Sequence, residues 1–158
     1  MQRMSTDLKR EIFSTSLKHT AQLGRAIGRS LKGGEVIQLV SDIGGGKTTL
    51  TKSIVAGTGC KAVVASPTFT VSKEYQAAHL KIRHFDFYRL QDAGVVGIEL
   101  QEGFSDPCTV TIIEWSDIVK DVLPTDTITI TIQHTKEHER LFTIDVPTDK
   151  RYILRELA

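Results

Sequence analysis

The chain has 158 residues, the usual length of one globular domain, and we expect a single domain over 1–158. Apolar residues make up 40% and charged residues 25%, a composition typical of a folded protein and not of an intrinsically disordered one. The net charge of +1 provides no strong field for nucleic acid or for an anionic membrane, so we expect no backbone-driven binding of either.

Cysteine usage and hydropathy bear on the cellular compartment. Cys60 and Cys108 lie far apart and form no Cys-x-x-Cys pair, so neither a zinc site nor a disulfide scaffold is expected. The first residues lack the apolar stretch of a signal peptide, and no apolar run approaches the roughly 20 residues of a membrane-spanning helix. We therefore expect a cytoplasmic protein with no membrane partner.

The first part of the chain alternates strand-like and helix-like segments. Residues 10–15 are predicted to form a short strand. Ser16 suits the N-cap of a helix over 17–31, where apolar residues recur at helical spacing. Residues 36–40 form a β-branched run typical of a buried strand. A glycine-rich turn and then a helix over about 47–56 follow.

The middle of the chain is predicted to be richer in strands. Residues 69–75 and 80–88 have the pattern of two strands joined by a short polar turn, which predicts a β-hairpin. A partly helical stretch is expected at 92–103. Residues 109–113 have the pattern of a fully buried strand.

The last part of the chain is predicted to contain a second hairpin. Ser116 is expected to cap a short helix that runs through Val122. Residues 127–132 and 141–146 both alternate polar and apolar side chains, and residues 151–157 have no firm assignment. The chain is therefore expected to be α/β, with parallel strands and helices early and antiparallel strands late.

A phosphate-binding loop is predicted between the strand at 36–40 and the helix after it. The P-loop pattern is Gly-x-x-x-x-Gly-Lys-Ser/Thr, and residues 41–48 read Ser-Asp-Ile-Gly-Gly-Gly-Lys-Thr. Glycines let backbone N–H groups face a phosphate, the lysine ammonium reaches the β- and γ-phosphates, and the threonine hydroxyl is a ligand for Mg²⁺. We therefore expect ATP with Mg²⁺ to be bound by Asp42, Ile43, Gly44, Gly45, Gly46, Lys47, Thr48 and Thr49.

The loop also has another interpretation, which is a flexible glycine-rich turn before an ordinary helix. Ser41 also replaces the first glycine of the pattern, and it would cost on the order of 1 kcal/mol if the backbone there required a positive φ. The serine therefore predicts an altered loop or a weaker affinity for nucleotide.

Two carboxylates are candidates for holding Mg²⁺ and orienting the attacking water. Glu114 ends the apolar strand at 109–113, where a Walker-B acid is found, and Asp86 lies among aromatic residues. We expect Asp86, Glu114 and Lys47 to be catalytic, and Thr48 with the two acids to bind the metal. The alternative for each acid is a salt-bridged strand residue, and spacing does not decide which acid has which role.

Three further residues near these motifs have two interpretations each. Thr68 follows the loop by about 20 residues, the interval in which P-loop proteins often hold a switch segment; a simple turn is the alternative. Trp115, the only tryptophan, is expected to line the nucleotide pocket or a docking face, unless it fills the core. His84 is expected to be an ordinary strand histidine.

Four segments, in this order, are similar to those of the TsaE family, also called YjeE, of bacterial ATPases in tRNA threonylcarbamoyladenosine synthesis. They are 41–50, 66–70 (Ser-Pro-Thr-Phe-Thr), 84–90 (His-Phe-Asp-Phe-Tyr-Arg-Leu) and 113–116 (Ile-Glu-Trp-Ser), within a resemblance over roughly 14–146. The resemblance implies a P-loop NTPase-like three-layer α/β fold. Its mixed sheet would have parallel core strands and added antiparallel strands.

The resemblance also implies a function. The chain would bind ATP and Mg²⁺, hydrolyse ATP slowly by itself, and associate with TsaD and TsaB, which transfer the threonylcarbamoyl group to adenosine 37 of ANN-decoding tRNAs. ATP hydrolysis would reset that complex, so tRNA would be contacted only indirectly. On the family pattern Lys47 and Thr48 bind phosphate and Mg²⁺, and Asp86 and Glu114 serve the metal and the water. The family usually has glycine where this chain has Ser41.

Two other functions stay open. A small-molecule kinase uses the same loop but usually carries an arginine-rich lid, and Arg140, Arg151 and Arg155 are scattered. A non-catalytic nucleotide-binding interaction module is suggested by Ser41. A GTPase is disfavoured because the chain has no Asn-Lys-x-Asp segment.

Overall fold

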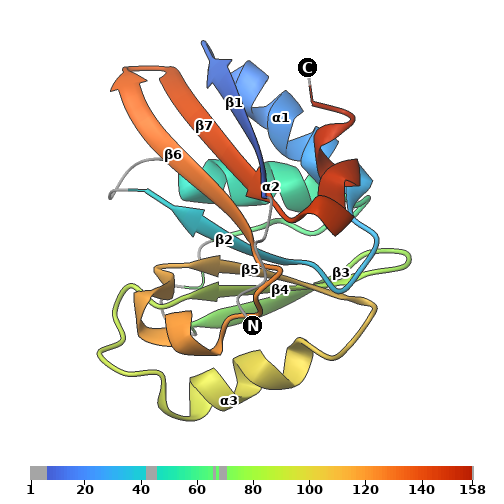
Figure 1. Ribbon diagram of the computed structural model, residues 1–158, viewed down its shortest axis with the longest axis vertical. Helices are drawn as coiled ribbons and strands as arrows, with labels where there is room; N and C mark the ends of the chain where they lie inside the picture. Colours follow the sequence, from blue (N-terminus) through green and yellow to red (C-terminus); the bar gives the residue numbers. More distant parts are fainter. Residues whose placement is uncertain (1–6, 42–45, 66, 68–70, 158) are drawn as a thin grey trace.

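The structure is a computed structural model that describes residues 7–41, 46–65, 67 and 71–157. A seven-stranded sheet runs through it in the order β1-β7-β6-β2-β5-β4-β3 (Figure 1). The strands are β1 (Leu8–Ser14), β2 (Val36–Val40), β3 (Ser72–Gln76), β4 (Lys81–Asp86), β5 (Thr109–Glu114), β6 (Ile128–Lys136) and β7 (Glu139–Val146). The helices are α1 (Leu17–Ser30), α2 (Lys47–Gly57) and α3 (Gly94–Gly103), with 3-10 segments η1 (Ser116–Val122) and η2 (Thr148–Leu154).

The centre of the sheet is parallel. β2 pairs in parallel with β5 on one side and β6 on the other, and β4 pairs in parallel with β5. The carboxyl ends of these four strands therefore lie at one edge of the sheet, which we call the carboxyl edge. The outer strands are antiparallel, because β7 pairs with β6 and β1, and β3 pairs with β4.

The mixed sheet with a parallel core confirms the predicted fold class, but the expected order along the chain was wrong. β1, the first strand, is antiparallel and pairs with β7, from Leu8 opposite Val146 to Ser14 opposite Arg140. β6, a late strand, belongs to the parallel core. Alternation within a strand indicates which side chains are buried, but it does not identify the strand's partner.

Two apolar clusters make the fold three-layered. The larger cluster joins α1 and α2 to one face of the sheet, through residues such as Ile27 and Ile54. The smaller one joins α3 and η1 to the other face, through Leu100, Val119 and Phe85. Figure 1 shows α1 and α2 on one side of the sheet and α3 on the other. In the described part of the chain, no helix combines the length and apolarity that crossing a bilayer requires.

The helices α1 and α2 touch through their backbones. An ideal Cβ placed on Gly28 would lie 2.8 Å from Cα of Gly57, closer than real side chains allow. Gly24 meets the side chain of Ser53 in the same way. These glycines let α2 lie close against α1, which fixes the position of the helix that begins at Lys47.

The local predictions were mostly confirmed. The Ser16 hydroxyl accepts a hydrogen bond from His19 N at 3.0 Å, as expected of an N-cap. The helix at 92–103 is α3, the second hairpin is β6 and β7, and the unassigned tail contains η2.

Two boundaries were wrong. The first hairpin is shorter than predicted: β3 begins at Ser72, because Val71 has a left-handed φ of 64° that a strand does not accommodate, and residues 69 and 70 lie outside the described chain. Ser116 does not cap η1, because Trp115 takes the N-cap position. The Ser116 hydroxyl instead donates to Gln38 Oε1 at 2.8 Å.

Candidate functional site

Several of the residues predicted from the sequence lie at the carboxyl edge. β2 ends at Val40, just before Ser41. Asp86 and Glu114 are the last residues of β4 and β5 and lie opposite each other in the parallel register. Open α/β sheets bind their ligands beyond the carboxyl ends of their strands, so this is where a ligand site is expected.

Some of the predicted residues are not described. Asp42, Ile43, Gly44, Gly45 and Thr68 lie outside the described residues. Gly46, Thr48 and Thr49 are described and half-buried at the start of α2.

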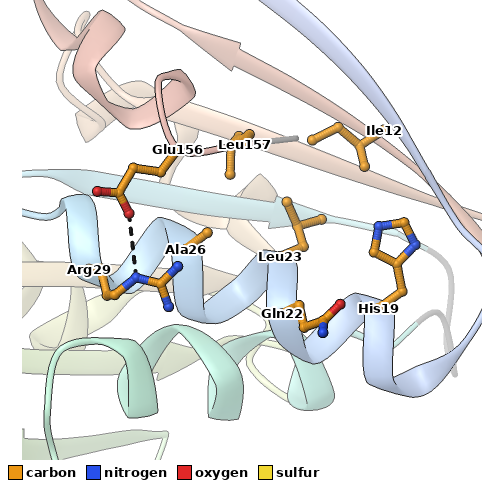
Figure 2. Close-up of a pocket in the computed structure, with 8 residues that line it drawn as sticks. All are labelled: Ile12, His19, Gln22, Leu23, Ala26, Arg29, Glu156 and Leu157. Atoms are coloured by element: carbon orange, nitrogen blue, oxygen red, sulfur yellow. Dashed lines mark hydrogen bonds and ion pairs between the residues drawn. The ribbon is translucent and has the colours of Figure 1, made fainter.

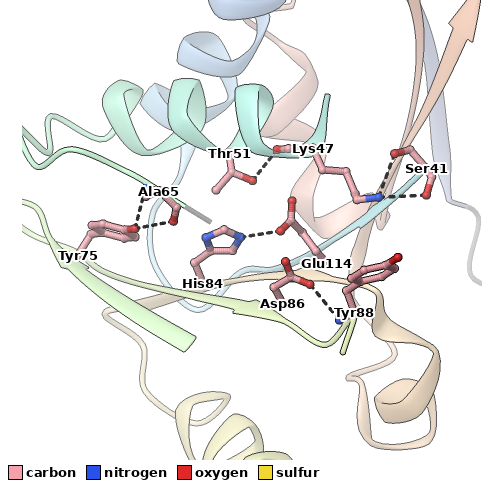
Figure 3. A network of polar contacts seen from close by, with 9 residues as sticks. All are labelled: Ser41, Lys47, Thr51, Ala65, Tyr75, His84, Asp86, Tyr88 and Glu114. Carbon is pink, nitrogen blue, oxygen red and sulfur yellow. Dashed lines mark hydrogen bonds and ion pairs between the residues drawn. The ribbon is translucent and has the colours of Figure 1, made fainter. Parts of the chain in front are cut away.

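Lys47 is enclosed at the start of α2, with a relative exposure of 8%. Its ammonium donates to the Ser41 carbonyl oxygen at 3.1 Å and to the Ser41 hydroxyl at 3.2 Å (Figure 3). The same ammonium lies 4.0 Å from the centroid of the Trp115 ring, within the range of a cation–π interaction. The lysine side chain therefore turns back over the end of β2 and toward the residue that follows β5.

Ser41 has a role that its sequence position did not suggest. Among the described non-glycine residues, positive φ occurs at Val71 and Trp115, and Ser41 is not one of them. The expected backbone cost of serine at this position therefore does not arise in this structure. The hydroxyl that replaces the glycine hydrogen instead contacts the Lys47 ammonium.

Trp115 has a strained backbone and packs between two site residues. Its φ of 57° and ψ of 55° are left-handed, which costs a bulky residue roughly 1–2 kcal/mol. Its ring lies 4.9 Å from the Tyr88 ring, and its other neighbour is the Lys47 ammonium. The half-buried indole also packs on the smaller apolar cluster, so Trp115 both lines the site and fills the core.

Glu114 is a buried acid with one partner. Its Oε2 lies 3.1 Å from Nε2 of His84, and the two side chains are 3% and 0% exposed. Within the part of the chain that is described, Oε1 of Glu114 and Nδ1 of His84 have no hydrogen-bond partner. Glu114 therefore has a polar partner inside the sheet through one carboxylate oxygen, and its other oxygen is left unused.

Asp86 is held differently. Its side chain is half-buried, and Oδ1 accepts a hydrogen bond from the backbone N–H of Tyr88 at 3.0 Å. Its own N–H donates to the carbonyl oxygen of Val71 at 2.8 Å. Asp86 is thus fixed by the loop that follows β4, and Glu114 by a side chain from inside the sheet (Figure 3).

Two residues at the site were not predicted to act there. His84 was expected to be an ordinary strand histidine, but it lies beneath Glu114. The signal was its spacing, because residues 84 and 86 of one strand face the same side of a sheet. Arg140 is at the start of β7, and its Nε would lie 3.8 Å from a Cβ placed on Gly46. Its position follows from the pairing of β6 with β2, for which the sequence gave no signal.

The donor set fits a phosphate with a divalent cation. Gly46, with φ of 97°, is the N-cap of α2, and the first N–H groups of a helix attract anions. In the described ranges no three His, Cys, Asp or Glu side chains cluster closely enough to hold a metal by themselves. Mg²⁺ is usually held by one or two carboxylates with substrate phosphates and waters, so this site suits that ion only together with a phosphate ligand.

A pocket elsewhere carries no comparable chemistry. It lies between β1, α1 and the C-terminal tail, with a lining that includes Ile12, Leu23 and Leu157 (Figure 2). The Arg29 and Glu156 side chains close one end with an ion pair of 3.4 Å, and both are more than half exposed. None of these elements contributes a predicted site residue.

Comparison with known proteins identifies the family. Residues 14–142 match the family model described as "Threonylcarbamoyl adenosine biosynthesis protein TsaE". The chain belongs to the TsaE family. The match includes Lys47, Asp86 and Glu114, and it confirms the family that the sequence motifs predicted. The description of the TsaE family places its members in threonylcarbamoyl adenosine biosynthesis.

Individual relatives agree with this assignment. A TsaE protein from Bacillus subtilis is 32% identical over 139 residues, which cover 88% of this chain and 87% of the relative. A TsaE protein from a Nostoc species is 35% identical over 117 residues, covering 72% of each. The crystal structure of YdiB from Bacillus subtilis matches with a TM-score of 0.76 at 26% identity, over 94% of this chain and 92% of that one. The fold is therefore that of a solved relative.

Proposed function

We propose that this TsaE chain is a Mg²⁺-dependent ATPase that acts with TsaD and TsaB in the threonylcarbamoyladenosine modification of tRNA. One observation carries the proposal: Lys47, Asp86 and Glu114 come from three separate elements and meet at the carboxyl edge beside the predicted phosphate loop. An ammonium at the start of a helix and two carboxylates at the ends of neighbouring strands are groups that phosphoryl chemistry uses.

ATP binding is proposed at the start of α2. The N–H groups of the first turn and the Lys47 ammonium would bind phosphate oxygens. To do so, the ammonium exchanges its contacts with Ser41 for contacts with phosphate, and it stays close to the Trp115 ring. Because the ammonium already has partners in the resting protein, part of the phosphate binding energy replaces those contacts.

The two acids are proposed to serve the metal and the water. Mg²⁺ would supply positive charge against the negative charge that develops on the phosphate oxygens. Thr48 and one or both carboxylates would hold it. The unpartnered Oε1 of Glu114 is suited to accept a hydrogen bond from water or to bind a cation, because a buried carboxylate oxygen without a partner is costly.

The proposed partners are proteins, and tRNA contact is proposed to be indirect. A net charge of +1 gives the chain little general attraction for a polyanion, so TsaD and TsaB would carry the substrate tRNA. We place this activity in the cytoplasm, where ATP and tRNA are both available.

The direct test is the ATPase rate of the chain with and without the TsaD–TsaB pair. We expect slow hydrolysis by the chain alone and faster hydrolysis with the pair, both dependent on Mg²⁺. A folded chain that binds ATP but hydrolyses none under either condition would favour the interaction module. Phosphoryl transfer to a small metabolite would favour the kinase.

Glu114→Ala tests the role of the buried acid. We expect kcat to fall about 100-fold or more, because a group that acts on the attacking water contributes to the transition state rather than to ATP binding. The Kd for ATP, measured by calorimetry, should change much less. Glu102→Ala, which removes an exposed acid from α3, is the matched control and should leave both quantities unchanged. Equal losses of binding and rate in Glu114→Ala would contradict the assignment.

A further inference from the structure

We propose that His84 is a positioning residue for Glu114. By donating its Nε2–H to Oε2, His84 fixes the carboxylate so that Oε1 faces the first turn of α2, where Lys47 lies (Figure 3). This inference rests on the proposed ATPase function, which it deepens by adding a residue to the site.

The direction of the hydrogen bond follows from the chemistry of the pair. Both side chains are almost fully buried, and an ionised carboxylate in such a place is stable only with a donor beside it. We assign the donor role to Nε2 of His84, 3.1 Å from Oε2, because a carboxylate that is to hold a metal or a water accepts through its oxygens.

The two side chains stand on neighbouring strands inside the sheet. β4 and β5 are parallel neighbours in which His84 is opposite Ile112 and Asp86 is opposite Glu114. The imidazole therefore lies one side-chain row behind the two acids, on the face of the sheet that α2 covers. Groups built on central strands hold their geometry better than groups on loops.

The unused atoms distinguish this pair from an ordinary structural contact. Polar atoms of buried structural pairs are nearly always satisfied, but here Glu114 Oε1 and His84 Nδ1 have no partner in the described chain. With Oε2 engaged by His84, the oxygen left for another group is Oε1. Histidine thus selects which carboxylate oxygen is presented, as residues behind metal-binding side chains commonly do.

Two substitutions at position 84 separate positioning from packing. His84→Leu keeps an apolar volume in the sheet but removes the donor, and His84→Gln retains an N–H near the place of Nε2. We expect kcat of His84→Leu to fall about 10- to 100-fold with KM for ATP changed by no more than about threefold. We expect His84→Gln to recover most of the lost kcat. His79→Leu, which changes an exposed histidine in the turn between β3 and β4, is the matched control and should have no effect.

A second measurement needs neither nucleotide nor activity. A two-bond ¹H–¹⁵N spectrum of the nucleotide-free protein reports which nitrogens of its five histidines carry protons, and the His84 signals are assigned by their loss in His84→Gln. We expect Nε2 of His84 to be protonated.

Two results would overturn the inference. One is an unprotonated Nε2 in the folded wild-type protein. The other is an equal loss of kcat in folded His84→Leu and His84→Gln, or no loss in either. These results are distinct from failure of the proposed function, which would appear as a wild-type chain that hydrolyses no ATP with or without TsaD and TsaB.

Discussion

At the scale of single residues, Trp115 is a strained position within the site. Its left-handed backbone directs the chain away from the sheet directly after Glu114, and this places the indole between the Tyr88 ring and the Lys47 ammonium. Residues held in such conformations persist only where the surrounding packing overdetermines them. The packing that holds Trp115 in this conformation therefore includes its contacts with Tyr88 and with the Lys47 ammonium.

A pair of substitutions measures this strain. Trp115→Ala and Trp115→Gly both remove the indole, but only glycine adopts a left-handed φ without steric cost. We expect Trp115→Gly to be more stable than Trp115→Ala by about 1 kcal/mol in urea unfolding. Lys120→Ala and Lys120→Gly, at an exposed position in η1, are the matched controls. Here the alanine variant should be the more stable of the two, because alanine is the better helix former. Equal stability of the two Trp115 variants would show that no strain is stored.

At the scale of elements, the contact between α1 and α2 sets where the site begins. Gly28 packs directly on α2, where an added Cβ would collide with the carbonyl oxygen of Ile54 and lie 2.8 Å from Cα of Gly57. Backbone atoms of a neighbouring helix cannot move aside as the tip of a flexible side chain can. The position of Lys47 at the start of α2 therefore depends on these glycines.

Gly28→Ala tests that dependence. We expect the free energy of unfolding to fall by about 1–3 kcal/mol, as is usual when an extra methyl group is forced into a packed interface. Lys18→Ala, at an exposed position of α1, is the control and should change stability by less than about 0.5 kcal/mol. A Gly28→Ala variant as stable as the wild type would contradict the close packing of the helices.

The turn into β5 supplies a prediction on pH. Hydrogen bonds from Cys108 N at 2.9 Å and from the Thr109 hydroxyl at 2.8 Å hold the pKa of Asp106 below its ordinary value of 3.8. A pKa that is lower in the folded state contributes stability above the unfolded-state pKa, and this contribution is lost as the pH falls through the folded value. Asp106→Asn should therefore be less stable than wild type at pH 7, with a smaller difference at pH 3. Urea midpoints at the two pH values measure this, and an unchanged difference would contradict it.

The sequence was informative about elements and less so about their pairing. The strand at 36–40, the cap at Ser16 and the second hairpin follow local rules, and all were predicted correctly. The pairing of β1 with β7 brings together segments from opposite ends of the chain, and alternation does not specify such a partner.

Some residues of the candidate site could be predicted from the sequence, and others depend on how the strands pair. Lys47, Asp86 and Glu114 are recognisable because each stands at a motif or at the end of an apolar run. The contact of His84 with Glu114 and the closeness of Arg140 to Gly46 depend on strand order, which only the folded chain fixes. The single domain over 1–158 stays a prediction.

At the scale of the whole molecule, the strand order of the sheet brings the site residues together. β2 lies between β5 and β6, so the carboxyl end of β2 has the acids of β4 and β5 on one side and the β6–β7 hairpin on the other. Sequence segments that are far apart thereby contribute an ammonium, two carboxylates and an arginine to one edge. The central claim is that a triphosphate binds at this edge.

Calorimetric titration of Lys47→Ala with ATP and Mg²⁺ tests this claim most directly. Lys52→Ala is the matched control, because it removes an exposed lysine from the same helix. We predict that Lys47→Ala loses measurable ATP binding while its thermal unfolding stays cooperative, and that Lys52→Ala binds ATP like the wild type. An ATP affinity in Lys47→Ala equal to that of the wild type would contradict the account.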